Sequence, residues 1–480
     1  MKLENLTIKQ LLEAYENGDT TPKEAIEYYF GRIEAHDSDL NSYITVNSKI
    51  LDQLDSSSSA DKKGKLAGIP IAVKDVVSTQ DLLTTCASHI LDGYKPTFES
   101  TITQRILDEG ALILGKTNLD EFCHGSSTET SYYGPSRNPW DTEKLPGGSS
   151  GGSAAATVAD LCPASLGTET AGSLRQPASW CGCVGFKPTY GRVSRYGIIA
   201  MGSSLDSPGP LTKNVEDAAI ILGVIAGKDK NDFTTSDKEV PDYAGALSKD
   251  AAQHMKFGIP KSWMELEIEE GIRKSFYSAV EILKSAGAEV VEVDMIDAKY
   301  AIAVYTLICR SEVSSNLSRF DGTRYGLSLD EQKLVFDYYE KVRGEGFGEE
   351  AKRRVMTGTF SLSAGYADEY FKIAEKCRRA LKADVLNILQ NVDAIIAPTT
   401  PVTAMKVGEA SKNPLFGEMM DVFAETSSLS GLPGISIPCG FSDSMPVGFQ
   451  FFSRHFEEQL LLDAAYFLES ELNLPIKSPI

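Results

Sequence analysis

The sequence predicts an α/β fold, because strand-like and helix-like segments alternate along most of the chain. Apolar and polar residues alternate over residues 255–260 and again over 288–293, which is typical of strands with one buried face. Apolar residues recur at helical spacing over residues 215–226 and 269–286, so amphipathic helices are expected beside these strands. This alternation favours layers of helix packed on sheet.

The sequence predicts one domain, although its length would allow more than one. The chain has 480 residues, more than an average domain, but large α/β enzymes often form one unit of this size. Neither an internal repeat nor a clean linker interrupts it, and residues 301–389 are almost continuously helical in pattern. We therefore expect a single domain over residues 1–480, with a mainly helical region at about 300–390.

The first hundred residues predict two helices and then a strand. The chain begins with an acidic amphipathic stretch typical of a helix start. Thr21 to Glu24 form a capping box with proline in the first helical position, so a second helix is expected through about Ala35. Residues 52–65 are polar and Ser-rich and predict a surface loop or a frayed helix end. Residues 66–77 predict a buried strand, with Lys74 at or near its end.

The later elements follow the same alternation. Apolar runs of strand length predict strands at 111–114, 392–397, 434–438 and 446–452. Helical periodicity predicts helices at 101–109 and 457–472.

Charge and composition disfavour some classes of function for this chain. The formal net charge is −20, which disfavours nucleic-acid or membrane-surface binding by the chain itself, since both depend on Lys and Arg. A nucleic-acid substrate held by a partner stays open. No apolar run approaches the roughly 18 residues of a membrane span, and the N-terminus lacks the pattern of a secretion signal. We expect a soluble, cytoplasmic protein.

The eight cysteines do not form a zinc-site pattern. No C-x-x-C pair is present and the chain has only five histidines. Cys181 and Cys183 are interpreted as small buried thiols in a packed strand rather than a metal or redox pair.

A first Gly-Ser turn, residues 147–153, runs directly into a helix start at 154–158. A flexible linker is one reading, and a turn whose N–H groups cradle an anion or oxyanion is the other. The P-loop spacing is missing. Gly-x-Ser-x-Gly around Ser149 also matches the nucleophile elbow of α/β-hydrolases, but only His254 and His455 follow it and neither has a motif-like setting.

A second turn, residues 167–173, offers consecutive backbone amides and Ser173. These amides could bind the oxyanion of a tetrahedral intermediate while Ser173 Oγ attacks a carbonyl. Serine needs an adjacent base, and without a suitable histidine a desolvated lysine such as Lys74 is the alternative, because burial favours the neutral amine. For Lys74 alone, a lysine that snorkels from a strand end is the competing interpretation.

The same motifs, with longer phrases around them, resemble the amidase-signature family. The family match rests on GIPIAVKD (68–75), GGSSGGSAAA (147–156) and the run from GTETAGS to SRYG (167–197). A closer resemblance, to the A subunits of glutamyl-tRNA(Gln) amidotransferases, rests on GKTNLDEFCHGSSTE (115–129), SEVSSNLSRFDGTRYG (311–326), FGEEAKRRVMTGTFSLSAGY (347–366) and GLPGISIPCGF (431–441) with MPVGFQ (445–450). Together these phrases span nearly the whole chain.

The resemblance implies a mixed central sheet covered by helices on both faces and a Lys–cis-Ser–Ser catalytic triad. Lys74 would be the base, Ser149 the bridging serine on a cis peptide, and Ser173 the nucleophile. The oxyanion hole would consist of the backbone amides of Thr170, Ala171, Gly172 and Ser173.

The resemblance also implies a substrate. Tyr305, Arg354 and Asp421 would hold glutamine, with the guanidinium on the α-carboxylate and the aspartate on the α-ammonium. Arg353, beside Arg354, is the alternative for the arginine, and surface helix charges are the alternative for the whole set.

The implied activity is hydrolysis of glutamine to ammonia, which partner subunits B and C of a heterotrimer use to convert Glu-tRNA(Gln) to Gln-tRNA(Gln). ATP and Mg²⁺ are expected in the partner that holds the charged tRNA, and no cofactor or metal in this chain. Asp-tRNA(Asn) is a second possible substrate of the complex. A stand-alone amidase acting on other small amides, and a catalytically silent scaffold protein, are the alternatives.

Three residues depart from the family pattern. Glu169 and Ala171 stand where the family usually has Asp and Gly, and Ala171 would be strained if the turn required a positive φ. His124 stands where these relatives usually have methionine, near the expected site, and is interpreted as a lining residue.

Overall fold

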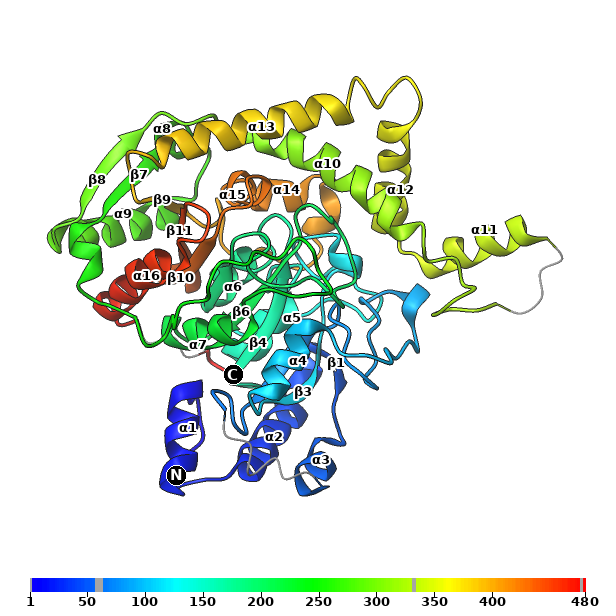
Figure 1. The fold of residues 1–480 in the computed structure, drawn as a ribbon, viewed down its shortest axis with the longest axis horizontal. Helices are drawn as coiled ribbons and strands as arrows, with labels where there is room; N and C mark the ends of the chain where they lie inside the picture. The colour runs from blue at the N-terminus through cyan, green and yellow to red at the C-terminus, as the bar shows by residue number, and fades with distance from the viewer. Residues whose placement is uncertain (1, 57–63, 330–333, 475–477) are drawn as a thin grey trace.

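The computed structural model describes residues 2–56, 64–329, 334–474 and 478–480, and one mixed sheet of eleven strands runs through them (Figure 1). The strand order is β1-β3-β2-β4-β6-β5-β10-β11-β9-β7-β8. The bounds are β1 Tyr43–Val46, β2 Pro70–Lys74, β3 Leu112–Thr117, β4 Ala164–Glu169, β5 Val184–Lys187, β6 Ser207–Thr212, β7 Lys256–Pro260, β8 Glu289–Val293, β9 Ala394–Pro398, β10 Gly434–Ser442 and β11 Met445–Ser453.

Helices flank this sheet. Their bounds are α1 Ile8–Asn17, α2 Pro22–Leu40, α3 Ile50–Ser56, α4 Thr101–Asp108, α5 Gly151–Val158, α6 Arg175–Cys181, α7 Val215–Ile225, α8 Lys261–Met264, α9 Glu270–Ser285, α10 Lys299–Leu317, α11 Val335–Gly346, α12 Glu349–Leu362, α13 Phe371–Ile388, α14 Phe416–Met420, α15 Glu425–Leu429 and α16 Glu458–Leu472. The predicted α/β fold class is confirmed.

The sheet changes from parallel to antiparallel pairing where the site forms. β2 lies between β3 and β4 and is parallel to both, with Val73 opposite Leu166 of β4. β4 then pairs antiparallel with β6 along its whole length. Because parallel neighbours end at the same edge, the C-terminal ends of β2 and β4 place Lys74 and the turn after Glu169 side by side.

The N-terminal helices match their sequence signals. In α2 the Thr21 side chain accepts a hydrogen bond from the Glu24 N–H, and the Glu24 side chain accepts one from the Thr21 N–H, as the capping box predicts. The helix extends to Leu40, beyond the predicted end at Ala35, because Leu40 is buried in the core and Asn41 supplies the left-handed residue that ends the helix.

Two strands of the central sheet carry no usable sequence signal. β4 (ASLGTE) is buried along its full length and lacks polar–apolar alternation. β6 (SPGPLT) contains two prolines, which normally argue against an interior strand. By contrast, β7 and β8 lie within one residue of their predicted bounds.

The prediction that Cys181 and Cys183 lie in a strand is wrong. Both thiols are buried, but Cys181 is the last residue of α6 and Cys183 precedes β5, with Gly182 in the left-handed conformation between them. The Gly182 turn reverses the chain from helix to strand. In the polar segment predicted at 52–65, α3 continues to Ser56, and residues 57–63 lie outside the described part.

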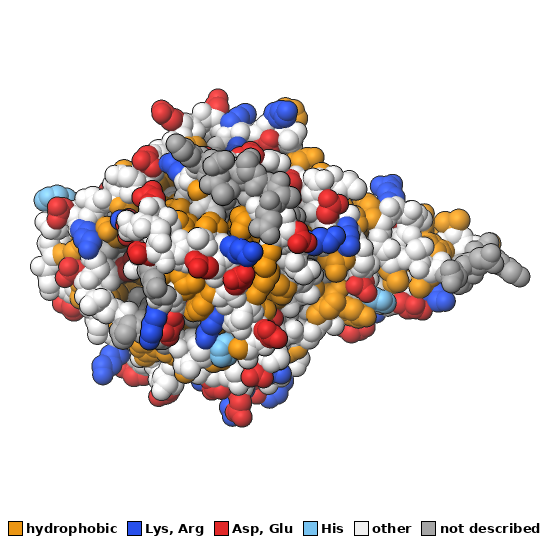
Figure 2. Space-filling model, turned by 90° about the horizontal axis from the view of Figure 1, so that it is seen from below, with side chains coloured by type: hydrophobic (Ala, Val, Ile, Leu, Met, Phe, Trp, Pro, Cys, Tyr) orange, Lys and Arg blue, Asp and Glu red, His pale blue; other side chains and the backbone are white. Residues whose placement is uncertain are grey.

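The predicted helical region forms α10 to α13. α10 packs against both α12 and α13, while α11 extends away from the body of the molecule (Figure 1). The face seen in Figure 2 carries acidic and basic side chains side by side, without a continuous basic stripe. In the described ranges no helix combines the length and the apolar character needed to cross a membrane.

Candidate active site

Lys74, at the end of β2, is fully buried and surrounded by oxygen atoms. Its Nζ lies 2.7 Å from Ser149 Oγ, 2.9 Å from Ser150 Oγ, 3.0 Å from Thr168 Oγ1 and 3.3 Å from the Thr168 carbonyl oxygen. Burial lowers the pKa of the Lys74 ammonium, although Cys123 and Asp120 oppose this shift. An ammonium can only donate, whereas a neutral amine can also accept a proton from a hydroxyl.

Ser149 lies on the first Gly-Ser turn and follows a cis peptide bond from Gly148. The Gly148 N–H donates to Gln176 Oε1 at 2.8 Å. The other side of Gly148 is closed by the Asp120 carboxylate, which would clash with any β-carbon placed there. Glycine is therefore required at position 148 by close approach rather than by flexibility.

In the second turn, the carbonyl groups of residues 171 to 173 accept hydrogen bonds from neighbouring parts of the chain. The Ala171 carbonyl accepts from Ser428 Oγ at 2.6 Å, that of Gly172 from the Gln176 N–H at 2.7 Å, and that of Ser173 from the Ser150 N–H at 3.3 Å. Among the described residues, the N–H groups of positions 170 to 173 donate no backbone hydrogen bond outside regular helices and strands. This is a condition that oxyanion donors at these positions must meet.

The departure at Glu169 is accommodated by a buried ion pair. Glu169 Oε1 lies 2.5 Å from Arg175 Nη2, and Glu169 Oε2 accepts from the N–H groups of Leu174 and Arg175 at the start of α6. Ser428 Oγ, whose proton goes to the Ala171 carbonyl, also lies 3.1 Å from Glu169 Oε1. Ala171 has a negative φ, so the strain that a positive φ would cause does not arise. The longer carboxylate therefore supports the turn directly.

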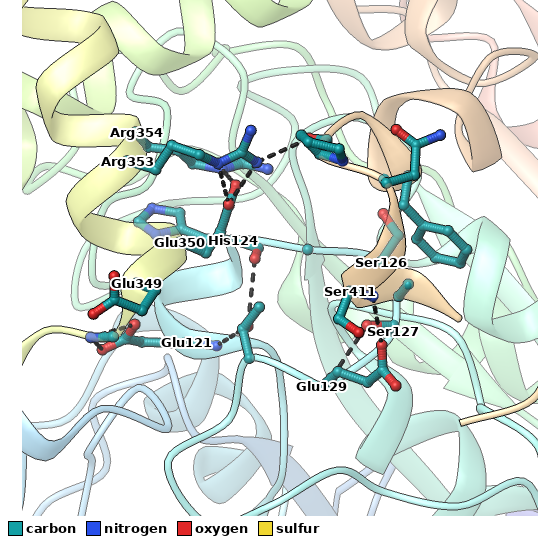
Figure 3. A pocket seen from close by; sticks show the side chains of 18 of the residues that line it. Glu121, His124, Ser126, Ser127, Glu129, Glu349, Glu350, Arg353, Arg354 and Ser411 are labelled. Atoms are coloured by element: carbon teal, nitrogen blue, oxygen red, sulfur yellow. Dashed lines mark hydrogen bonds and ion pairs between the residues drawn. The ribbon is translucent and has the colours of Figure 1, made fainter. Parts of the chain in front are cut away.

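A cavity of about 790 Å³ is lined by residues from the segments 121–130, 348–356 and 410–418, and by none from the two Gly-Ser turns (Figure 3). Its lining residue Ser127 lies against Gly148 of the first turn. Arg354, on α12, lines it, with its side chain 5% exposed; its Nε donates to Glu350 Oε1 at 2.6 Å. Arg353 also lines the cavity but is 36% exposed and donates to the Pro414 carbonyl at 2.8 Å. Arg354 is thus the more buried of the two arginines, and its Nη2 also lies 3.9 Å from Glu418 Oε1.

The other two predicted substrate residues are buried and do not line the cavity. Tyr305, on α10, is buried, and burial raises its pKa well above the ordinary value. Asp421, which follows α14, accepts from Ser126 Oγ at 3.1 Å through Oδ2, and its Oδ1 has no hydrogen-bond partner among the described residues. Burial raises the pKa of the Asp421 carboxyl well above its usual range, and the nearby Glu169 adds to this shift.

Asp421 also connects the cavity to the second turn. A β-carbon on Gly172 would clash with Asp421 Oδ1, so the carboxylate lies directly against the turn that carries Ser173. Ser126, the donor to Asp421, lines the cavity. The structure therefore brings Lys74 and Ser149 into contact, and places Asp421 beside the Ser173 turn.

Several side chains at this site were not predicted from the sequence. Ser150 and Thr168 contact Lys74 directly, Gln176 and Asp120 flank the cis peptide, and Asp206 accepts from Thr170 Oγ1 at 2.8 Å. Burial raises the pKa of Asp206 to about 6. Ser150, Thr168 and Gln176 lie inside the family phrases at 147–156 and 167–197. Their polar side chains within these phrases were the sequence signal that could have marked them as site residues. Among the described residues, no group of three or more His, Cys, Asp or Glu side chains could hold a metal ion.

Comparison of the sequence with known proteins shows the family to which the chain belongs. The model of the family described as Amidase matches residues 24–462. The A subunit of the glutamyl-tRNA(Gln) amidotransferase of Halothermothrix orenii is 44% identical over 480 residues, covering 100% of both chains. The A subunit of the same enzyme from Staphylococcus haemolyticus is 44% identical over 481 residues, covering 99% of each chain.

Solved structures give the same grouping. The crystal structure of the glutamyl-tRNA(Gln) amidotransferase A subunit from Thermotoga maritima is 41% identical, with a TM-score of 0.83 over 99% of this chain and 96% of that one. A peptide amidase from Stenotrophomonas maltophilia is 27% identical, with a TM-score of 0.84 over 99% of both chains.

The fold and the matched motifs thus define an enzyme of the amidase-signature class, as the resemblance predicted. At full length and 44% identity, the chain belongs to the amidase family and, within it, to the group of glutamyl-tRNA(Gln) amidotransferase A subunits.

Proposed function

We propose that this chain is the glutamine-hydrolysing subunit of a tRNA-dependent amidotransferase. Partner subunits B and C would complete a heterotrimer, and the partner that binds charged tRNA, ATP and Mg²⁺ would use the ammonia to convert Glu-tRNA(Gln) to Gln-tRNA(Gln). The acidic net charge of −20 supports leaving tRNA binding to a partner. The relatives are named as A subunits of glutamyl-tRNA(Gln) amidotransferases, which supports a complex with further subunits.

The observation that supports the chemistry most is the buried contact of Lys74 Nζ with Ser149 Oγ at 2.7 Å. In the proposed reaction, Ser173 Oγ attacks the carboxamide carbon of glutamine, and its proton passes through Ser149 to the neutral amine of Lys74. The developing oxyanion accepts hydrogen bonds from the amides of residues 170 to 173.

The remaining steps return the proton and clear the acyl-enzyme. The C–N bond breaks as Lys74, through Ser149, protonates the departing nitrogen, which leaves as ammonia. Water then adds to the acyl-enzyme, the ester bond to Ser173 breaks, and glutamate leaves. Binding would rest on Arg354 for the α-carboxylate, Asp421 for the α-ammonium and Tyr305 beside them.

Ser173→Ala tests this assignment. The variant should release ammonia from glutamine about a thousandfold more slowly than the wild type, or slower still, because the nucleophile is lost while the oxyanion donors remain. The assay uses the chain alone and with its partner subunits, charged tRNA and ATP. Ser318→Ala, at an exposed position after α10, is the matched control and should keep full activity.

The outcome separates the alternatives. Activity of Ser173→Ala within tenfold of the wild type would overturn the nucleophile assignment. Serine-dependent hydrolysis of simple amides by the chain alone, with glutamine ignored, would make the protein a stand-alone amidase, a possibility that the similarity to a peptide amidase supports. No amide hydrolysis in any setting would favour the silent scaffold.

A further inference from the structure

His124 is a buried histidine in the cavity wall that none of the proposed chemistry uses. Its side chain is fully buried, and neither Nδ1 nor Nε2 has a hydrogen-bond partner among the described residues. Buried polar atoms without partners are uncommon and cost stability, so each one needs an explanation.

The backbone around His124 is fixed. The His124 N–H donates to the Glu121 carbonyl at 2.8 Å, and the His124 carbonyl oxygen lies 3.3 Å from Thr130 Oγ1. Asp120 fastens the rest of this loop by accepting from the Ser127 N–H at 3.1 Å and from Thr130 Oγ1 at 3.0 Å. The imidazole is therefore held in place by its loop, although its nitrogens bond to no described group.

The position of His124 points to one end of the proposed substrate. It lines the same cavity as Arg354, and Figure 3 shows it next to Glu350 and beneath Arg353 and Arg354. Ser126, two residues further along the same loop, donates to Asp421. The loop thus spans the space between the proposed anchors of the α-carboxylate and the α-ammonium.

The charged groups around Arg354 leave room for a further donor to a bound carboxylate. Arg354 Nε donates to Glu350, and Arg354 Nη2 lies 3.9 Å from Glu418 Oε1, which Arg310 contacts at 3.1 Å. A substrate carboxylate has two oxygens and can accept hydrogen bonds from more than one side chain. A second donor is available in the imidazole.

We propose that His124 is a substrate-binding residue whose neutral imidazole donates one N–H hydrogen bond to the α-carboxylate of the amino-acid substrate, alongside Arg354. This inference rests on the proposed glutamine hydrolysis. Burial lowers the pKa of His124 well below its ordinary value, and the Arg354 cation adds to that effect. A neutral imidazole still carries one donor, and a hydrogen bond to a charged oxygen is stronger than one between neutral groups.

The test compares two substrates that differ only in the α-carboxylate. Ammonia release from L-glutamine and from 4-aminobutanamide, which lacks that group, is measured with the full chain and its partner subunits. The His124→Met variant should lower the ratio of kcat/KM for glutamine to kcat/KM for 4-aminobutanamide by about 10- to 100-fold. His124→Gln and His124→Asn, which keep an N–H donor, should restore part of this ratio.

A control and the opposing outcomes complete the experiment. His254→Met, the same change at an exposed histidine outside this cavity, should leave the ratio unchanged. An equal loss for both substrates in His124→Met would overturn the inference in favour of a packing role, and no loss for either would overturn it outright. Wild-type protein that releases no ammonia from glutamine would instead refute the proposed function, and the inference with it.

Discussion

Lys74 shows how the surroundings of one residue decide its chemistry. An isolated lysine at a strand end would extend its ammonium to water. Here the amine is fully buried and its four oxygen contacts include no carboxylate. The free energy of desolvation therefore favours the neutral amine, which is the form that can accept a proton from a serine hydroxyl.

Gly172 shows how closely the two halves of the site approach each other. It belongs to the turn that carries Ser173, whereas Asp421 comes from the far end of the chain. The Asp421 carboxylate fills the space that a side chain at position 172 would need. The spacing between the proposed nucleophile and the proposed ammonium anchor is thereby set by the absence of one carbon atom.

Gly172→Ala should lower kcat/KM for glutamine by about 100-fold, because the added methyl group displaces Asp421 or the Ser173 turn and a misplacement near 1 Å costs about this much. Gly223→Ala in α7 is the control, since an added β-carbon there meets no atom within 4 Å. The measurement is steady-state ammonia release. Near-wild-type activity of Gly172→Ala would show that the turn does not depend on this contact.

At the scale of elements, the helix α12 directs two adjacent arginine side chains to different surroundings. Successive residues of a helix point about 100° apart, so Arg354 faces the cavity wall while Arg353 reaches toward the surface. Glu350, one turn earlier, pairs with both: its Oε2 lies 2.5 Å from Arg353 Nη2 and its Oε1 lies 2.6 Å from Arg354 Nε. The sequence alone left the choice between the two arginines open.

Arg354→Ala should raise the KM for glutamine by about 100-fold, which corresponds to losing a hydrogen-bonded charge pair with the α-carboxylate. Arg353→Ala, its matched neighbour, should change KM by less than about threefold, because exposed ion pairs contribute little. Glutamine titrations of ammonia release give both values. A larger effect from Arg353→Ala would transfer the binding role to that residue.

At the scale of the whole molecule, the sheet next to the site is joined by a buried ion pair. Lys116 Nζ, on β3, lies 3.1 Å from Asp75 Oδ1, directly after β2, and both side chains are fully buried. Lys116 also donates to the Val77 carbonyl at 2.8 Å and to Thr84 Oγ1 at 2.7 Å. Because Asp75 follows Lys74, this network also fixes the end of the strand that carries the proposed base.

Lys116→Met should lower the free energy of unfolding by about 3–5 kcal/mol, because the Asp75 carboxylate is left buried without its cation. Lys256→Met removes an ion pair with Glu289 whose side chains are 37% and 60% exposed, and should cost less than about 1 kcal/mol. Urea denaturation of both variants measures the difference. Equal stability of the two variants would show that the buried pair is not a stabilising feature.

Much of this molecule was predictable from local sequence. The alternation at 255–260 and the capping box at Thr21 are signals carried by a few neighbouring residues, and β7 and α2 form where they indicate. The two Gly-Ser turns and Lys74 likewise indicated a hydrolytic site without a usable histidine, and the longer phrases around them indicated the amidase family, which the comparisons confirm.

Only the tertiary structure decided which groups meet at the site. Lys74 contacts Ser149 and Thr168 across 75 and 94 residues, and Ser126 contacts Asp421 across 295. The burial that changes the pKa of Lys74, Asp421 and His124 is likewise a property of the packed molecule. Local sequence fixes which side chains are available, but their distances and solvation depend on contacts between remote segments, which form only when the sheet is assembled.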